Sequence, residues 1–192
     1  MEYLSQILAD YILKKQVITP ESYYIYKYGF LCFLEMSIST IFSTIIALLL
    51  QMPHECLFFF IIFIPMRSLN GGLHLKNYFS CFLASVLVLL STLLIVKYMH
   101  VPIKFSLIMY IICTLFILIV GPINHPNKSI SVDENNILKR KTYFMLSLTS
   151  LIALILFVTR NKKYLLLLSI IFAFIITTSI LAKVIQKRTK NF

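Results

Sequence analysis

The sequence predicts an all-α, polytopic integral membrane protein with about six transmembrane helices and an amphipathic interfacial helix at its N-terminus. Of the 192 residues, 59% are hydrophobic and only 13% are charged, whereas about a quarter of a typical soluble domain is charged. Apolar runs nearly free of charge recur along the chain and approach or reach the ~20 residues that cross a bilayer. Lys and Arg also gather in alternate connections between these runs. We expect residues 1–192 to form a single membrane-embedded domain.

The first element, residues 1–18, is expected to be an interfacial helix. Leu4, Ile7, Leu8 and Tyr11 recur at the spacing of one helical face. The amphipathic stretch is too short to span a bilayer, and no cleavage motif follows it, so it does not read as a signal peptide. We expect it to lie flat on the cytoplasmic leaflet.

Six transmembrane segments are expected to follow. Thr19 as a cap and Pro20 at the first helical position mark the start of the first one. The second apolar run, 57–66, is short, and three alternatives remain for it: a span through thinned membrane, a tilted helix that continues past Arg67, or a re-entrant segment. The connection 121–141 is rich in Gly, Pro, Asn and Ser and is expected to be irregular. The expected segments are residues 20–51, 53–69, 77–97, 103–122, 141–159 and 163–183.

The distribution of Lys and Arg favours one orientation. If the short run crosses and the N-terminus is cytoplasmic, thirteen of the 18 Lys and Arg residues lie inside and five outside. If the short run does not cross, eight lie inside and ten outside. The positive-inside rule therefore predicts six crossings with both termini in the cytoplasm. Membrane topology and attraction to anionic membrane lipid explain the net charge of +11. The sequence has no basic stripe with interleaved stacking aromatics, so it gives no indication of nucleic-acid binding.

The stretch RSLNGGLHLKNYFSC, residues 67–81, places polar and reactive groups between two apolar runs. Asn77 is expected to cap the next helix, which puts Cys81 about one turn into it. There the positive end of the helix dipole lowers the pKa of a thiol. In one continuous helix, His74 and Cys81 would be separated by about 10 Å of rise, too far for proton transfer. A working pair therefore requires a break at residues 75–77; otherwise His74 is an interfacial polar residue and Cys81 a packing residue.

The arginine, glycine pair, histidine and cysteine of residues 67–81 resemble the core of the accessory gene regulator B family, whose members are bacterial membrane peptidases that process quorum-sensing peptide precursors. The sequence GPINHPNK, residues 121–128, is similar to a second family segment, and the resemblance extends over essentially the whole chain. It implies a cysteine endopeptidase of the bacterial cytoplasmic membrane, with His74 and Cys81 as the catalytic pair.

The resemblance also implies a substrate and a reaction. The substrate would be a precursor with an amphipathic leader, a central pheromone segment and an acidic tail. The Cys81 thiolate would attack the carbonyl at the pheromone–tail junction and form a peptide–enzyme thioester, while His74 passes the thiol proton to the leaving amine. A Cys or Ser of the peptide would then close a thiolactone or lactone. No cofactor and no metal are expected, and a homodimer is the assembly that the family and the compact size suggest.

Supporting and substrate-binding roles are expected for neighbouring polar residues. Arg67 is costly near the hydrocarbon edge, so we expect it to dock the acidic tail, stabilise the oxyanion or pair with Glu35. Glu35, in the first apolar run, is expected to pair with Arg67 or orient His74; a helix–helix or dimer contact is the alternative. The complete set of supporting candidates is Arg67, Glu35, Asn70, Gly71, Gly72 and Lys76.

Other residues and functions remain as alternatives. His125 is a rival base in an inside loop, whereas His54 and His100 fall on the outside. The remaining cysteines lack metal-ligand or disulfide spacing and read as packing residues. A small membrane transporter of peptide or lipid without covalent catalysis is the alternative function, and a structural partner subunit is a third. The remaining cysteines are Cys32, Cys56 and Cys113.

Overall fold

The structure, a computed structural model, describes residues 2–70, 78–120 and 132–190. This part of the chain is helical throughout apart from short connections, and it contains no strand, so the all-α prediction is confirmed. The elements are α1 (Glu2–Lys14), the 3-10 turn η1 (Pro20–Ser22), α2 (Tyr23–Leu49), α3 (Pro53–Asn70), α4 (Tyr78–Tyr98), α5 (Ile103–Val120), α6 (Val132–Val158) and α7 (Lys162–Lys190).

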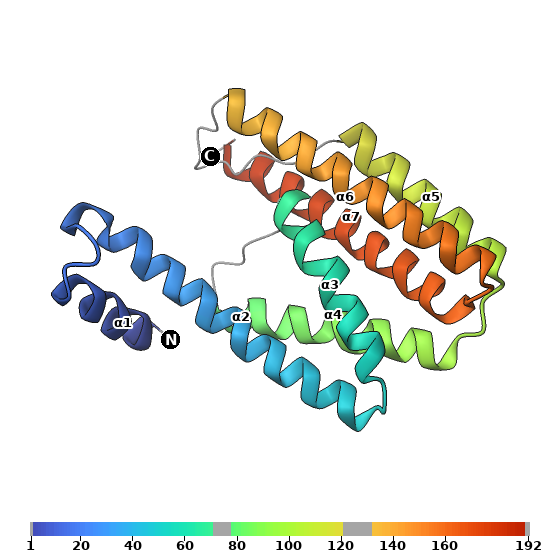
Figure 1. Cartoon of the computed structure of the whole chain (residues 1–192), viewed down its shortest axis with the longest axis horizontal. Helices are drawn as coiled ribbons and strands as arrows, with labels where there is room; N and C mark the ends of the chain where they lie inside the picture. Colours follow the sequence, from blue (N-terminus) through green and yellow to red (C-terminus); the bar gives the residue numbers. More distant parts are fainter. Residues whose placement is uncertain (1, 71–77, 121–131, 191–192) are drawn as a thin grey trace.

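Helices α2 to α7 alternate in direction, so their ends fall into two groups (Figure 1). At the end that we call the Glu55 end, α2, α4 and α6 finish and α3, α5 and α7 begin. At the opposite end, which we call the Arg67 end, α3, α5 and α7 finish and α4 and α6 begin. Contacts at the Glu55 end agree with this arrangement, because Lys97 near the end of α4 donates a hydrogen bond to the Leu50 carbonyl at the end of α2 (3.2 Å).

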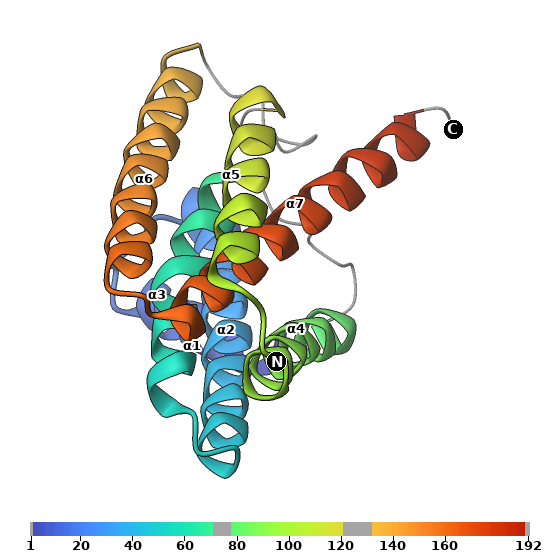
Figure 2. The same cartoon turned by 90° about the vertical axis from the view of Figure 1, so that its right-hand side faces the viewer.

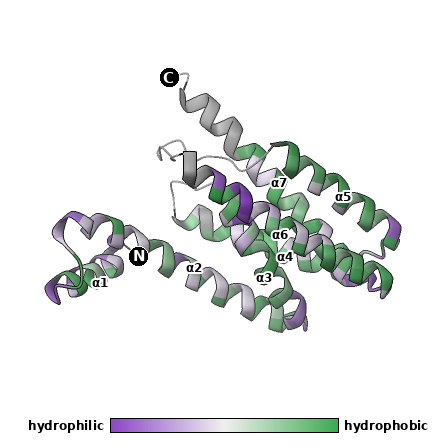
Figure 3. Cartoon of the chain, turned by 45° about the horizontal axis from the view of Figure 1, so that its top comes forward, coloured by the Kyte–Doolittle hydropathy of each residue, from purple (hydrophilic) through white to green (hydrophobic). Residues whose placement is uncertain are grey.

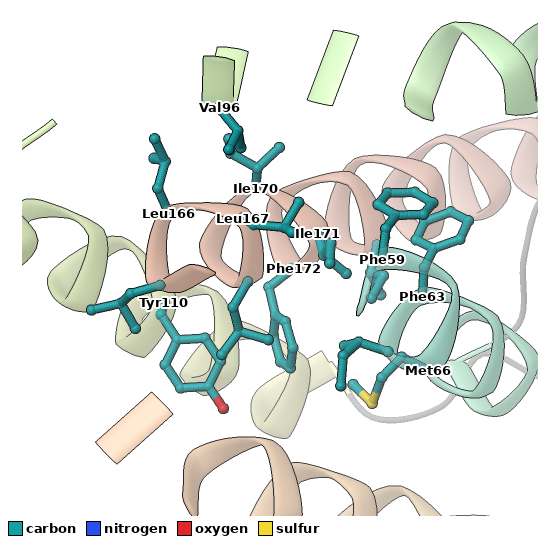
Figure 4. Packing of buried hydrophobic residues seen from close by; sticks show 14 of the residues in the cluster. Phe59, Phe63, Met66, Val96, Tyr110, Leu166, Leu167, Ile170, Ile171 and Phe172 are labelled. Atoms are coloured by element: carbon teal, nitrogen blue, oxygen red, sulfur yellow. The ribbon is translucent and has the colours of Figure 1, made fainter. Parts of the chain in front are cut away.

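Helix α7 is the centre of the bundle. It crosses α5 and α6 obliquely and packs against α3, α4, α5 and α6 (Figure 2). Residues 165–172 are all buried, as expected of a helix that is apolar on every side. Phe59, Phe63 and Met66 of α3 approach it from one side and Tyr110 of α5 from another (Figure 4). The rings of Tyr110 and Phe172 meet edge to face, with centroids 4.8 Å apart.

Helix α1 packs antiparallel along the first turns of α2. The Tyr23 hydroxyl donates to Asp10 Oδ1 (2.7 Å), and Lys27 Nζ donates to Gln6 Oε1 (3.4 Å). The small residue Ala9 is fully buried, whereas the apolar side chains of the predicted amphipathic face are exposed. That face is therefore available to a membrane surface, and the interfacial position of α1 stays a prediction.

Three helices end in the same way without glycine. Gln16, Gln51 and Arg160 have positive φ angles of 57°, 60° and 54°. After α2, the Met52 amide donates to the Ala47 carbonyl (2.8 Å) and the Gln51 amide to the Leu48 carbonyl, as in a Schellman motif. The same pattern closes α1 and α6. The endings of α2 and α6 reverse the chain at the Glu55 end, and the ending of α1 leads back into α2.

Three helical segments are long and apolar enough to cross a membrane: Pro20–Leu49, Asn136–Val158 and Lys162–Leu181. The apolar parts of α4 and α5, Phe82–Tyr98 and Ile103–Ile119, are shorter. Hydrophilic residues gather around α1 and at helix ends, and apolar residues cover the helix lengths (Figure 3). These features indicate a membrane protein, while the number of crossings stays a prediction.

The structure bears on two expectations, one about the segment 121–141 and one about the short second apolar run. The segment 121–141 was expected to be irregular, but α6 begins at Val132, because Leu138, Lys139 and Arg140 favour a helix and extend the apolar segment that follows them. The short second run belongs to α3, one continuous helix that contains Pro65 and runs three residues past Arg67 from one end of the bundle to the other (Figure 1). The helix therefore continues past Arg67, and whether this run spans a membrane, tilted or otherwise, stays a prediction.

Candidate functional site

The residues predicted to carry chemistry lie around the connection between α3 and α4 at the Arg67 end. Arg67 is in the last turn of α3, and Asn70 is the last residue of that helix. Cys81 is the fourth residue of α4, which matches its expected place one turn into a helix. The helices α3 and α4 are separate and point in different directions (Figure 1). The predicted break at residues 75–77 lies outside the described residues.

Several predicted residues lie outside the described residues. They belong to the α3–α4 connection and to the connection before α6, and the side chains of Asn70 and Cys81 are likewise not described. The catalytic pair, the asparagine cap and the rival base therefore stay predictions. The predicted residues outside the described part of the chain are Gly71, Gly72, His74, Lys76, Asn77 and His125.

The start of α4 is held against the middle of α2. Phe82, next to Cys81 in the chain, meets Phe42 of α2 edge to face, with ring centroids 5.4 Å apart. Such an aromatic contact contributes about 0.5–1.5 kcal/mol beyond the area it buries. It fixes where the turn that contains Cys81 begins relative to α2. Neither ring is identifiable from the sequence, because apolar residues in membrane helices carry no sign of which partner they face.

Arg67 is half-buried and stacks over an aromatic ring. Its guanidinium carbon lies 5.7 Å from the centroid of Phe63, one turn earlier on α3. This cation–π contact favours the charged group at the end of an apolar helix. Phe63 itself packs in the core beside Phe59, so the contact ties the arginine to the rigid part of α3.

Glu35 lies near the middle of α2 and is half-buried. No ion pair joins Glu35 to Arg67 in the described part of the structure. Helix α2 packs against both α3 and α4, so Glu35 is on the helix that borders the candidate site. Its predicted role toward Arg67 or His74 stays a prediction.

A groove of about 570 Å³ lies between the last turns of α3 and the first half of α6. It combines apolar walls with two cationic side chains, Arg140 and Lys141. Neither cation has a carboxylate partner among the described side chains. In the sequence, both residues indicate only the topology of the chain. The groove is lined by Pro65, Ser68, Leu69, Ile137, Arg140, Lys141, Phe144 and Met145.

The Glu55 end contains a different charged contact. Glu55 in the first turn of α3 forms a salt bridge with Lys163 in the first turn of α7, and it is the one ion pair between described side chains. The carboxylate is buried, with 8% of its side chain exposed, whereas Lys163 is 47% exposed. The pair fastens the central helix to α3 on the side opposite Arg67. An acidic residue at the start of a short apolar helix was the signal available in the sequence.

The other nucleophilic and metal-binding groups do not form a second site in the described part. Cys56 and Cys113 are buried in the apolar core, and Cys32 is half-buried on α2; all three are free thiols. No cluster of three or more His, Cys, Asp or Glu side chains occurs among the residues searched, which are the described ones.

The bundle of apolar helices indicates an α-helical membrane protein. The sequence model of the family described as accessory gene regulator B matches residues 5–186, and the chain belongs to this family. Neither the curated proteins nor the solved structures contain a match to the chain. Membership supports involvement in the processing of quorum-sensing peptides, because the family is in general a cysteine protease-like membrane enzyme that acts on a peptide precursor.

Proposed function

We propose that the chain is a membrane cysteine endopeptidase that removes the C-terminal tail of an autoinducing-peptide precursor at the cytoplasmic face. Cys81 is the nucleophile and His74 the general base. The observation that carries the proposal is the position of Cys81 in the first turn of α4, directly after the break that follows α3, in a member of this family. A thiol at that position is favoured as thiolate by the helix dipole.

The reaction proceeds in two acyl transfers. The Cys81 thiolate attacks the carbonyl at the junction, the peptide bond breaks, and His74 returns the proton to the leaving amine of the tail. The thioester is then attacked by a Cys or Ser of the peptide, which releases Cys81 as thiolate and closes a thiolactone or lactone. A site at the membrane boundary favours ring closure because it limits competition from water.

Arg67 and Lys76 dock the acidic tail, since both cations lie in or beside the connection between α3 and α4. We expect Asn70, Gly71 and Gly72 to shape that connection, and Glu35 is on α2, which packs against both α3 and α4. The described arrangement supports six crossings with both termini in the cytoplasm, because helices α2 to α7 alternate in direction (Figure 1). The proposed substrate is a precursor with an amphipathic leader. The proposed assembly is a homodimer of two copies of the chain.

The test uses the full chain co-expressed with a tagged candidate precursor, a peptide with an internal Cys or Ser and an acidic C-terminal tail. Cys81→Ala and His74→Gln are expected to abolish cleavage while membrane insertion is unchanged. Cys32→Ser is the matched control and is expected to cleave normally, because Cys32 belongs to α2 whereas the proposed nucleophile belongs to α4. Cleavage by Cys81→Ala would overturn the proposal and leave the transporter or partner-subunit alternatives.

A second measurement addresses the thiol directly. Iodoacetamide is expected to label Cys81 well below pH 8 in the intact protein, because only a thiolate reacts readily. Cys56 and Cys113 are expected to stay unlabelled under the same conditions, since both are buried. Labelling of Cys81 only at the pH typical of a free thiol would contradict its role as an activated nucleophile.

A further inference from the structure

The groove between α3 and α6 has a positively charged part and an apolar part, which suit different groups of a ligand. Arg140 and Lys141 supply positive charge from α6. Leu69 of α3 and Phe144 of α6 supply apolar walls, and Phe144 is exposed toward the outside of the bundle. The Ser68 hydroxyl is already used, because it donates to the Pro65 carbonyl (2.8 Å).

The two cations lie at the start of the apolar part of α6. Arg140 and Lys141 come directly before the long apolar stretch of this helix, and both side chains are exposed. No described carboxylate lies within ion-pair distance of either residue. Cations at this depth require an anion at the level of the lipid headgroups or must extend out to water.

We propose that the groove binds one anionic phospholipid, whose phosphate contacts Arg140 and Lys141 and whose acyl chain lies against Leu69 and Phe144. The charges are complementary, and the apolar walls match a hydrocarbon chain. Basic pockets between membrane helices on the inner side are a known kind of site for anionic headgroups. An acidic peptide would satisfy the cations but would leave the apolar walls exposed, so the lipid fits the whole groove better.

The bound lipid bridges α3 and α6 at the Arg67 end. Helix α3 leads directly into the connection that precedes α4, so a lipid that fixes the last turn of α3 restricts where that connection starts. If the proposed peptidase function holds, anionic lipid therefore activates cleavage. The binding itself does not depend on that function.

The experiment measures lipid binding to the purified full chain in dodecyl maltoside by native mass spectrometry and by thermal unfolding. The probes are dioleoylphosphatidylglycerol, dioleoylphosphatidylcholine, glycerol 3-phosphate and a hexaglutamate peptide. The test variant is Arg140→Gln with Lys141→Gln. The matched control, Lys104→Gln with Lys162→Gln, removes the same charge from exposed positions at the Glu55 end. All measurements are repeated in the Cys81→Ala background, which separates lipid binding from catalysis.

Phosphatidylglycerol is expected to bind and to raise the unfolding temperature, whereas phosphatidylcholine is not. The test variant is expected to bind phosphatidylglycerol about thirtyfold more weakly, since each basic residue at an anionic lipid surface contributes on the order of a factor of five. The control and the exchange Arg140→Lys with Lys141→Arg are expected to retain binding.

Three results would overturn the proposal. Equal binding of both lipids would show that charge is not recognised. Full stabilisation by glycerol 3-phosphate would show a simple phosphate site. Binding of hexaglutamate with no binding of phosphatidylglycerol would assign the groove to an acidic peptide. The unfolding temperature of each variant without added lipid, compared with that of the parent, shows whether it is folded.

Discussion

Phe42 of α2 and Phe82 of α4 meet edge to face with their ring centroids 5.4 Å apart, and Phe82 follows Cys81 in the chain. The contact joins the helix that bears Glu35 to the turn that bears the proposed nucleophile. Its strength and its effect on activity are both measurable.

Replacing either ring by alanine is expected to loosen the start of α4. A double-mutant cycle with Phe42→Ala and Phe82→Ala is expected to give a coupling of about 0.5–1.5 kcal/mol in the free energy of unfolding. Under the proposed function, peptide cleavage falls in both single variants. The control is Phe33→Ala on the exposed face of α2, which is expected to change neither quantity. Additive single effects on stability would show that the rings do not interact.

The Glu55–Lys163 pair is expected to respond unequally to the loss of each partner. Lys163→Gln leaves a buried carboxylate without a cation, so it is expected to cost about 2 kcal/mol or more. Glu55→Gln leaves a half-exposed ammonium that water can solvate, so the cost is expected to be under about 1 kcal/mol. Thermal unfolding of the two variants in detergent gives the comparison. Equal costs would contradict the difference in burial on which this prediction rests.

Tyr110 joins α5 to α6 through its hydroxyl. It donates to Thr149 Oγ1 (3.2 Å) and lies 3.2 Å from Ser150 Oγ. Tyr110→Phe keeps the ring contact with Phe172 and removes the hydrogen bonds, so we expect a loss of about 0.6 kcal/mol, typical for such bonds between membrane helices. Stability is measured by unfolding in mixed micelles. Tyr143→Phe, at an exposed position, is expected to have no effect.

Gln51 adopts a left-handed conformation at the end of α2, which glycine accepts without strain. Gln51→Gly is therefore expected to stabilise the protein by about 1 kcal/mol, or roughly 3 °C in unfolding temperature. Gln51→Ala keeps the strain and is expected to give no gain. A drop in unfolding temperature for the glycine variant would show that the Gln51 side chain contributes more than its backbone strain costs.

The fold class and the position of the candidate site were predictable for different reasons. Apolar runs of sufficient length, together with the placement of Lys and Arg, indicate membrane helices without any knowledge of packing. The described part of α4 coincides with the apolar run that begins at Tyr78, whereas the predicted cap Asn77 lies outside the described residues. The start of α6 was not predicted. The Gly, Pro and Ser residues that indicated an irregular segment lie early in 121–141, whereas Leu138, Lys139 and Arg140 later in it are good helix formers.

Partners within the bundle could not be predicted from this one sequence. Phe42 and Phe82 are two of 16 phenylalanines, and nothing in their spacing says that they meet. Glu55 was not identified as a structural residue, because its partner Lys163 follows more than a hundred residues later in the chain. Helix pairing in a membrane depends on shape and close packing, which a hydrophobicity pattern does not encode.

The burial of residues 165–172 has a consequence for how the protein is made. Helix α7 comes after α3, α4, α5 and α6 in chain order, yet it is the helix on which all four pack. During synthesis, α3 to α6 are therefore complete before the helix on which all four pack exists. The last described helix completes the assembly, so a ribosome that stalls before residue 165 would leave these helices without their common neighbour and open to proteases.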